Sequence, residues 1–526
     1  MSTTFNEAVA SNSEQQNKLL FWACFAALIA TSFGFIIRAL LIDTWGAQFN
    51  LTEVQKGEIF GAGLWPFAIS IILFSLIIDR IGYGTAMAFA FVCHIASVVM
   101  TVTATGYTQL YWAMFICALA NGTVEAVINP VVATLFPSAK VRWLNILHAG
   151  WPGGLVLGGI LTIAMGENAD WKNKVYLLLI PTVLYGILML GKRWPVQERV
   201  AAGVSYRDML REFGFIGAFL CAFLICTELA KWFLPAQNPM MVGVIGGVVV
   251  AVIFGAMTGF APGRPLFLIL MLIMIPLATT ELGVDSWVTS LMGPAMKDIG
   301  LQAGWVLVYT SLIMMLLRFA AGSIVHRLSP LGLLACSATI ALIGLYTLSG
   351  ATGIMILVAA TLYALGKTFF WPTTLGIVSE QFPRGGALTI NAIAGLGMLG
   401  VGIFGAAFIG LIQDSSVKSR ISTESPQIYQ QVQFSKKWAF GEYEAVDPEK
   451  VKTLPATDQE TVTKASDAAK QQALKTVCIF PAIMVVSYLI LLGYFKSKGG
   501  YQAEVLTGHA AVDEQFTGGV EGPVEA

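Results

Sequence analysis

Long runs of apolar residues, separated by short polar segments, extend along nearly the whole chain. A helix that crosses a bilayer needs about 20 mostly apolar residues, and fourteen runs have roughly this length. Their bounds are 19–42, 56–78, 85–104, 109–136, 143–166, 174–191, 212–232, 241–262, 266–291, 303–325, 331–349, 352–378, 387–412 and 474–495. Segments such as Val248–Phe254 are apolar at every position, whereas the strands of a membrane barrel alternate. The pattern therefore predicts an all-α integral membrane protein with about fourteen transmembrane helices.

The composition supports this fold class. The 526 residues include 31 basic and 31 acidic side chains, and charged residues make up only 12% of the chain. Ordinary soluble chains carry about twice this fraction, so the charges are too few to cover several soluble domains. The zero net charge also argues against a basic nucleic-acid-binding protein. We therefore expect a lipid bilayer around the protein and no nucleic-acid partner.

Catalytic and cofactor motifs are not found in the sequence. All seven cysteines lie inside apolar runs and at no metal-like spacing, so they are interpreted as small core residues. The sequence has no H-E-x-x-H, no nucleophile elbow and no phosphate-binding G-x-x-x-x-G-K-[ST]. We expect no catalytic residue, no metal, no cofactor and no enzymatic activity.

The basic residues of the short loops predict the orientation. With the N-terminus inside, the short inner segments hold fourteen Lys and Arg residues and the short outer loops hold five. Both termini are then cytoplasmic, in tails 1–18 and 496–526. The polar stretch 413–470 lies outside, and we expect a solvated loop there, with partial helix near 461–474 as the alternative. The acidic end of the second tail is expected to be disordered.

Short segments recur at a nearly constant offset of 242 to 247 residues, which indicates a parallel repeat. The matching segments are 42–45 with 284–287, 79–82 with 326–329, 136–137 with 382–383, and Asn145 with Asn391. The repeat predicts a six-helix half at 19–191, a cytoplasmic linker at 192–211, two inserted helices at 212–262, and a second six-helix half at 266–495. Parallel halves of this kind are one recurrent architecture of secondary transporters.

The loop after the second predicted span resembles a motif of the major facilitator superfamily, G-x-L-x-D-R-x-G. Here Asp79, Arg80 and Gly82 match the motif, and Ser75 replaces its leading glycine. A second copy in the other half keeps Arg327. The resemblance implies the major-facilitator fold, with this loop bracing neighbouring helices at the cytoplasmic face.

A narrower resemblance, to the fucose/proton symporter branch of that superfamily, lies in the fourth predicted span. Residues 122–130 fit its pattern G-x-x-E-x-x-x-N-P, with Glu125 and Asn129 at the polar positions, and 371–373 resemble a later Tyr-Pro-Thr motif. The resemblance implies that Glu125 takes part in proton coupling, and we expect a location in the bacterial inner membrane. The branch has an aspartate in its first span where this chain has Ala39.

Charged residues inside the predicted spans are the leading candidates for function, because a charge in a bilayer usually faces a cavity and has a partner. Glu125 is the first candidate for proton coupling. Glu281 lies 242 residues after Ala39, so the second half can supply the carboxylate that the first half lacks. The alternative for Glu125 is a permanent ion pair with Arg38, Arg142 or Lys367.

Further candidates would bind the substrate. Arg38 and Lys367 are able to hold hydroxyl groups or a carboxylate, and the alternative for both is pairing between helices. Amides and an aromatic ring suit a sugar, although the same residue types also join helices or lie at lipid interfaces. This set contains Asn129, Asn145, Trp371 and Asn391. Arg318 is expected to be structural, and His148 to be a packing residue in preference to a gate or relay.

These features together predict a monomeric secondary transporter that moves a small molecule, and probable coupling to protons makes it a symporter. The expected substrate is a sugar or related polyol, which follows from the branch resemblance and not from composition. An organic-anion transporter is the alternative that Arg38 and Lys367 favour. A non-transporting solute receptor is the alternative from another class, and the short central linker argues against it.

Overall fold

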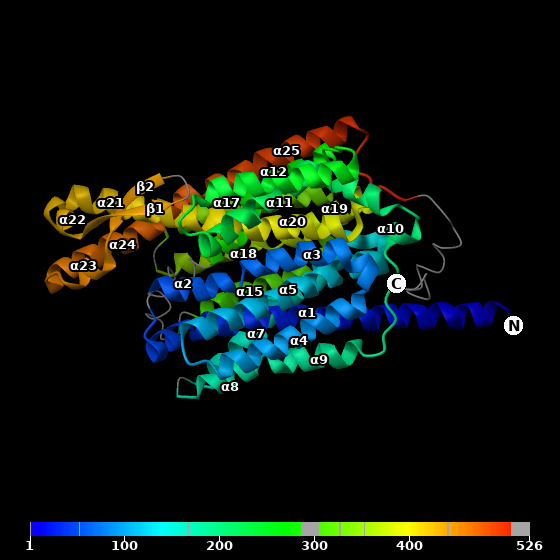
Figure 1. Ribbon diagram of the computed structural model, residues 1–526, viewed down its shortest axis with the longest axis horizontal. Helices are drawn as coiled ribbons and strands as arrows, with labels where there is room; N and C mark the ends of the chain where they lie inside the picture. The colour runs from blue at the N-terminus through cyan, green and yellow to red at the C-terminus, as the bar shows by residue number, and fades with distance from the viewer. Residues whose placement is uncertain are drawn as a thin grey trace.

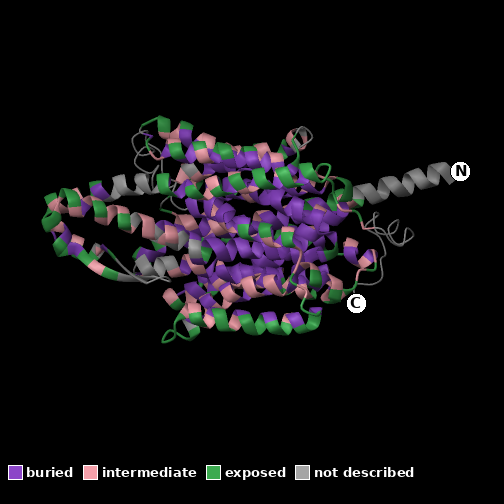
Figure 2. Cartoon of the chain, turned by 90° about the horizontal axis from the view of Figure 1, so that it is seen from above, coloured by how far each residue is buried: buried purple, intermediate pink, exposed green. Residues whose placement is uncertain are grey.

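The computed structural model describes residues 2–51, 53–166, 168–285, 304–325, 328–351, 353–438 and 441–506. Its helices run side by side in one bundle (Figure 1), and buried positions concentrate in the middle of that bundle (Figure 2). Among the described residues, thirteen helical segments are long and apolar enough to cross a membrane, and Leu307–Phe319 forms a shorter apolar helix. The predicted all-α membrane fold with about fourteen spans is therefore confirmed.

The N-terminal half is built from the helices of the first six spans. They are α1 (Ser2–Phe49), α2 (Glu53–Ala62), α3 (Trp65–Ile81), α4 (Tyr83–Val102), α5 (Tyr107–Leu135), α6 (Lys140–His148), α7 (Gly150–Ala164), α8 (Trp171–Tyr176) and α9 (Leu179–Met189). Gly82 turns the chain between α3 and α4 at φ 81°, a value that a residue with a side chain rarely adopts.

The C-terminal half follows the same plan. It contains α13 (Pro265–Ala278), the π-helical turn η2 (Thr279–Gly283), α15 (Gly304–Phe319), α16 (Ala321–Val325), α17 (Pro330–Leu348), α18 (Met355–Lys367), α19 (Phe370–Gln381), α20 (Gly386–Gly400), the π-helical turn η4 (Val401–Gly405), α21 (Ala406–Glu424) and α25 (Ile479–Ser497).

The repeat is visible in these bounds. Helix α5 ends at Leu135 and α19 at Gln381, and the 3-10 turns η1 (Pro137–Ala139) and η3 (Pro383–Gly385) follow them. Both pairs are separated by 246 residues (381 − 135 and 383 − 137), which is the offset that the sequence predicts. The same local breaks thus recur in both halves.

The linker between the halves carries α10 (Glu198–Ala201) and leads into the two inserted helices, α11 (Tyr206–Phe233) and α12 (Pro239–Thr258). Gly243, Gly247 and Gly255 are among the buried residues of α12, and at Gly243 and Gly247 the chain meets α11 closely enough that a larger residue would clash. Helix α11 in turn packs on α20 and α13. The inserted pair therefore lies against the outside of the bundle, as expected.

The stretch 413–470 differs from the predicted solvated loop. It continues α21 and forms α22 (Pro426–Val432), the antiparallel strands β1 (Gln433–Trp438) and β2 (Gly441–Val446), α23 (Pro448–Lys452) and α24 (Ala456–Val477). A small apolar core holds these elements together, formed by Ile421, Tyr429, Val432, Leu454, Val462 and Ala465. We call this folded part the cap unit. Its few apolar residues are spread thinly along the sequence, which explains why hydropathy alone missed it.

The cap unit and the linker lie at opposite ends of the bundle, called here the cap end and the linker end (Figure 1). The C-terminal segment 501–506 is fixed at the linker end. The Tyr501 hydroxyl donates to Glu380 at 2.7 Å, and Arg264 pairs with Glu504 at 2.7 Å. The part of the acidic tail that was expected to be disordered, 507–526, lies outside the described residues.

Candidate functional site

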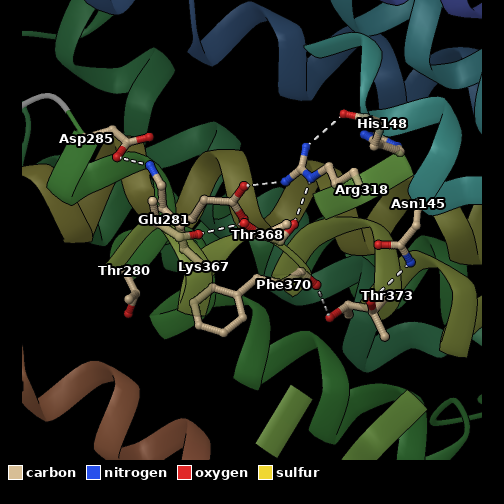
Figure 3. A network of polar contacts seen from close by, with 12 residues as sticks. Asn145, His148, Thr280, Glu281, Asp285, Arg318, Lys367, Thr368, Phe370 and Thr373 are labelled. Carbon is tan, nitrogen blue, oxygen red and sulfur yellow. Dashed lines mark hydrogen bonds and ion pairs between the residues drawn. The ribbon is translucent and has the colours of Figure 1, made fainter. Parts of the chain in front are cut away.

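Four of the charged side chains that the sequence singled out are deeply buried where the halves meet. Glu125 on α5 and Glu281 in η2 are each 4% exposed, and Arg318 on α15 and Lys367 on α18 are 1% and 0% exposed. Figure 3 shows Glu281, Arg318 and Lys367 in one network of polar contacts. Charges buried to this degree need partners, because their hydration is lost.

Arg318 joins the two halves. Its guanidinium donates to the Thr368 carbonyl at 2.7 Å and to Glu281 Oε1 at 3.0 Å within the C-terminal half. It also donates to the His148 carbonyl at 2.8 Å, across the boundary between the halves. The sequence favoured a structural role close to the loop motif, whereas this geometry places Arg318 at the centre of the interface.

The π-helical turn η2 places Glu281 toward Arg318. Pro276 precedes this turn inside the same helix and cannot donate a backbone hydrogen bond, which favours a local widening. The widening leaves carbonyl groups free, and the Tyr363 hydroxyl donates to those of Thr280 and Glu281 at 2.5 and 3.2 Å. The sequence analysis missed Tyr363. Its position four residues before Lys367, on the same helix face, is the signal that could have found it.

Lys367 is bound within its own half. Its ammonium group pairs with the Asp285 carboxylate and lies 4.9 Å from the centre of the Tyr363 ring. These contacts match the alternative of pairing between helices. Lys367 is therefore held by protein groups in this structure.

Glu125 has a different environment. Asn129 Nδ2 lies 3.4 Å from Glu125 Oε2, and the other side of the Asn129 amide accepts or donates at 3.0 Å with His148 Nε2. Within the described residues, no Lys, Arg or His nitrogen lies within 4 Å of the Glu125 carboxyl, so the alternative pairs with Arg38, Arg142 or Lys367 are not formed. Arg318 is nonetheless within electrostatic reach of Glu125.

The Asn129-Pro130 step explains a contact between the halves. Pro130 has no N–H, so the Ala126 carbonyl four residues earlier loses its helical donor. Asn391 Nδ2, on α20 of the other half, donates to this carbonyl at 2.9 Å and also to Ser75 Oγ at 2.9 Å. Ser75 is the residue that replaces the leading glycine of the loop motif, and its hydroxyl supplies the acceptor.

The matching residue of the N-terminal half makes a matching contact. Asn145 Nδ2 donates to Thr373 Oγ1 on α19 at 3.2 Å. Asn145 and Asn391 are 246 residues apart, and their targets, Thr373 and Ala126, are 247 apart. These pseudo-symmetric bonds hold the halves together, so the amides that were expected to bind substrate bind protein here. Trp371 is 7% exposed and packs near Gly397 inside the C-terminal half.

Arg38 lies away from this network. It is 2% exposed on α1, its Nη1 is 4.0 Å from the Met114 sulfur, and its guanidinium stacks 4.5 Å from the centre of the Phe60 ring. All three residues belong to the N-terminal half. The structure therefore does not bring Arg38 together with the other substrate-binding candidates.

The loop motif is at the linker end. Asp79 forms an ion pair with Arg199 of the linker, and the Arg80 guanidinium lies 5.2 Å from the centre of the Tyr206 ring. Tyr206 also donates to the Leu76 carbonyl at 2.9 Å. The first copy of the motif thus holds the linker against α3. Arg327, in the second copy, lies outside the described residues.

Comparisons with known proteins place this architecture. A structure of the proton:xylose symporter XylE bound to 6-bromo-6-deoxy-D-glucose matches with a TM-score of 0.57 at 14% identity, over 90% of this chain and 96% of that one. A structure of the human organic anion transporter MFSD10 matches with a TM-score of 0.57 at 11% identity, over 90% and 99% of the two chains. The chain has the major facilitator fold.

Sequence comparisons reach less far. No protein-family model matches the chain. The cis,cis-muconate transport protein of Acinetobacter baylyi is 25% identical over 177 residues, which are 33% of this chain and 42% of that relative. The match thus spans about two fifths of the relative's length. In the major facilitator fold described here, the charged network of Figure 3 lies where the two halves face each other.

Proposed function

We propose that this protein is a secondary active transporter that moves a small solute across a membrane by alternating access. The major facilitator fold and the buried charges between its halves support this proposal. The excess of basic residues in the segments at the linker end supports a cytoplasmic position for that end and for both termini. We propose a monomer in the cell membrane.

Glu125 is the proposed proton carrier. The observation that supports it is a carboxyl group with 4% exposure and no cation within 4 Å among the described residues. An ionised carboxylate in such a place costs several kcal/mol, whereas a protonated one costs little. Glu125 therefore carries its proton in this state. Glu281, which is paired with Arg318, is the second carboxyl in the proposed coupling.

Arg318 connects the two carboxyl groups. It is bonded to Glu281 and lies within electrostatic reach of Glu125. When the halves rock apart at the linker end, its bond to the His148 carbonyl must break. A guanidinium that then moves toward Glu125 favours release of the proton, because a nearby cation stabilises the carboxylate.

The charges of the site favour an uncharged solute. With Glu125 protonated, the two cations Arg318 and Lys367 are balanced by Glu281 and Asp285. A solute that enters with the proton and carries no charge leaves this balance intact. A sugar or related polyol is therefore the first candidate, and a proton:xylose symporter shares the fold.

An organic carboxylate is the second candidate. The curated relative is a cis,cis-muconate transport protein, and a human organic anion transporter shares the fold at the same TM-score. A carboxylate would have to displace Glu281 or Asp285 from its cation. Fold likeness at 11–14% identity does not separate the two candidates.

Counterflow in proteoliposomes tests the proposal. Vesicles loaded with one unlabelled sugar, polyol or dicarboxylate are diluted into the same labelled solute, and transient accumulation identifies the substrate. Solute added outside should then make the external medium more alkaline. Transport without alkalinisation would contradict proton symport, and binding without counterflow would favour the non-transporting receptor.

A further inference from the structure

A small cavity lies inside the N-terminal half, apart from the charged network between the halves. Its volume is about 20 Å³, and its lining residues come from α1, α4, α5 and the α8 region. Arg38, Trp45, Ser97 and Cys117 are the polar or polarisable residues among them. The sequence analysis placed Arg38 in a substrate site, and the proposed transport function leaves this cavity unexplained.

Two hydrogen-bond donors at this cavity have no acceptor. Arg38 Nε and Trp45 Nε1 are both buried without a hydrogen-bond partner, and their side chains are 2% and 1% exposed. The two residues are seven positions apart on α1 and therefore lie on the same helix face. A guanidinium and an indole N–H can only donate, so the cavity offers donors and a positive charge.

The Arg38 charge is also uncompensated. No carboxylate lies within 4 Å of it among the described residues, and the Met114 sulfur at 4.0 Å is a weak acceptor. The Phe60 ring offsets only part of the loss of hydration. A buried cation without a counter-charge is unfavourable in a membrane protein, and a group that accepts both N–H bonds and supplies negative charge would remove the penalty.

The volume restricts what that group can be. About one water-sized probe needs 10–15 Å³, so a cavity of about 20 Å³ holds one water molecule or one monatomic ion. A sugar ring or an organic carboxylate is too large. A water molecule would accept the hydrogen bonds but would leave the charge of Arg38 unbalanced.

We propose that this cavity is a halide site that binds one chloride ion between Arg38 and Trp45. The ion accepts from Arg38 Nε and Trp45 Nε1 and balances the guanidinium charge. It stabilises the packing of α1 against α4 and α5 and takes no part in moving the solute. The proposal is independent of the transported substrate and of Glu125.

Anion-dependent unfolding of the full-length protein in detergent tests the site. Gluconate is replaced by chloride or bromide at constant ionic strength, and the unfolding temperature is recorded. We expect a saturable rise of about 5 °C with either halide, and no rise with sulfate, which is too large for the cavity. An unfolding temperature that does not depend on halide would overturn the proposal and leave water as the occupant.

Variants assign the effect to the cavity. Arg38→Met should abolish the halide-dependent rise, and Trp45→Phe, which keeps an aromatic ring but removes the N–H, should raise the half-saturating chloride concentration about tenfold. Lys464→Met changes a side chain that is 75% exposed in the cap unit and should leave the rise unchanged. If Arg38→Met does not fold, Trp45→Phe carries the test alone. An unaltered chloride response in Trp45→Phe would place the ion elsewhere.

Discussion

The N-terminal half buries Arg38 and Glu125 without an oppositely charged partner among the described residues, whereas the C-terminal half buries its charges as pairs. Arg318 is bonded to Glu281 and Lys367 to Asp285. The two halves share one backbone plan, with equivalent breaks 246 residues apart. They therefore differ in charge chemistry far more than in fold.

This difference suggests a division of labour. A buried pair costs hydration free energy, but each ion compensates its partner, so the pair is fixed in place. An unpaired buried group must be neutralised by something that enters from solution. In the N-terminal half that would be a proton at Glu125 and an anion at Arg38, while the C-terminal half provides a fixed reference against which the other half moves.

Arg318→Met should have the largest effect on this comparison, because it leaves Glu281 buried and unpaired and removes the bond to the His148 carbonyl. We expect a loss of about 3–5 kcal/mol in unfolding free energy, measured by denaturant unfolding in detergent. The double variant Arg318→Met/Glu281→Gln should recover most of the loss. The matched change in the other half, Arg38→Met in chloride-free buffer, should cost far less. Equal losses for the two arginines would contradict the comparison.

Glu125→Gln should separate transport from coupling. We expect proton-driven uptake to fall by about 100-fold, a typical contribution of one acid–base group, while counterflow continues because the neutral amide resembles the protonated carboxyl. Glu281→Gln leaves Arg318 without its carboxylate and should reduce counterflow as well. Radiolabelled uptake with and without an imposed pH gradient measures both. If Glu281→Gln left proton-coupled uptake unchanged, Glu281 would have no part in coupling.

The spans and the proton carrier were accessible from the sequence for different reasons. Membrane helices follow from the length and hydropathy of apolar runs, which is a local property. Glu125 was found through its G-x-x-E-x-x-x-N-P context. The ion pairs were not accessible, because Arg318 and Glu281 lie 37 residues apart and Lys367 and Asp285 lie 82 apart on different helices. Which cation meets which carboxylate depends on helix rotation and packing, and no local pattern encodes these.

The amides show a related limit. The sequence indicated that Asn129, Asn145 and Asn391 belong to a polar set, and it left open whether they bind substrate or join helices. The structure shows bonds across the halves for Asn145 and Asn391. The deciding signal was Pro130, whose missing N–H leaves the Ala126 carbonyl in need of a donor. That step requires a three-dimensional partner 265 residues away.

The two pseudo-symmetric amides should differ in strength. Asn391→Ala removes donors from Ser75 and from the Ala126 carbonyl, and Pro130 allows no helical donor to replace the latter. We expect a loss of about 1–3 kcal/mol, against about 1 kcal/mol for Asn145→Ala, whose bond to Thr373 is its sole link across the halves among those described. Thermal unfolding measures both losses. A larger loss for Asn145→Ala would show that the equivalence of these contacts does not extend to their energies.

Opening of the linker end offers a second measurement of the same pair. Weaker bonds between the halves should raise the reactivity of a cysteine introduced at the buried Ser379, next to Lys140, which donates to its carbonyl at 3.3 Å. We expect the increase to be larger in Asn391→Ala than in Asn145→Ala. A cysteine at the exposed Ser422 of the cap unit serves as the control, and its reactivity should be the same in both variants.

The smallest effect is expected where a charge pair is exposed, which extends the comparison outside the membrane. In the cap unit, Lys418 lies 2.7 Å from Glu444, and Tyr429 donates to Glu444 at 3.2 Å. The hydrogen bond from Lys418, followed by that from Tyr429, lowers the pKa of Glu444 below its usual 4.5, and Glu444 raises the pKa of Lys418 above its usual 10.5. Because both side chains are more than a third exposed, solvent and salt weaken the attraction.

The signs define a pH window for this contribution. A carboxyl with a lowered pKa stabilises the folded form above about pH 4.5 and loses that contribution as the pH falls through its folded value. A lysine with a raised pKa contributes below about pH 10.5 and loses its contribution above that. Hydrogen exchange in β1 and β2, corrected for intrinsic rates, should therefore speed up slightly between pH 6 and pH 3.5. Lys418→Met should remove most of this change, and Lys464→Met, in the separate exposed pair with Glu460, should not. A change as large as that for Arg318→Met would show that burial does not set the strength of these pairs.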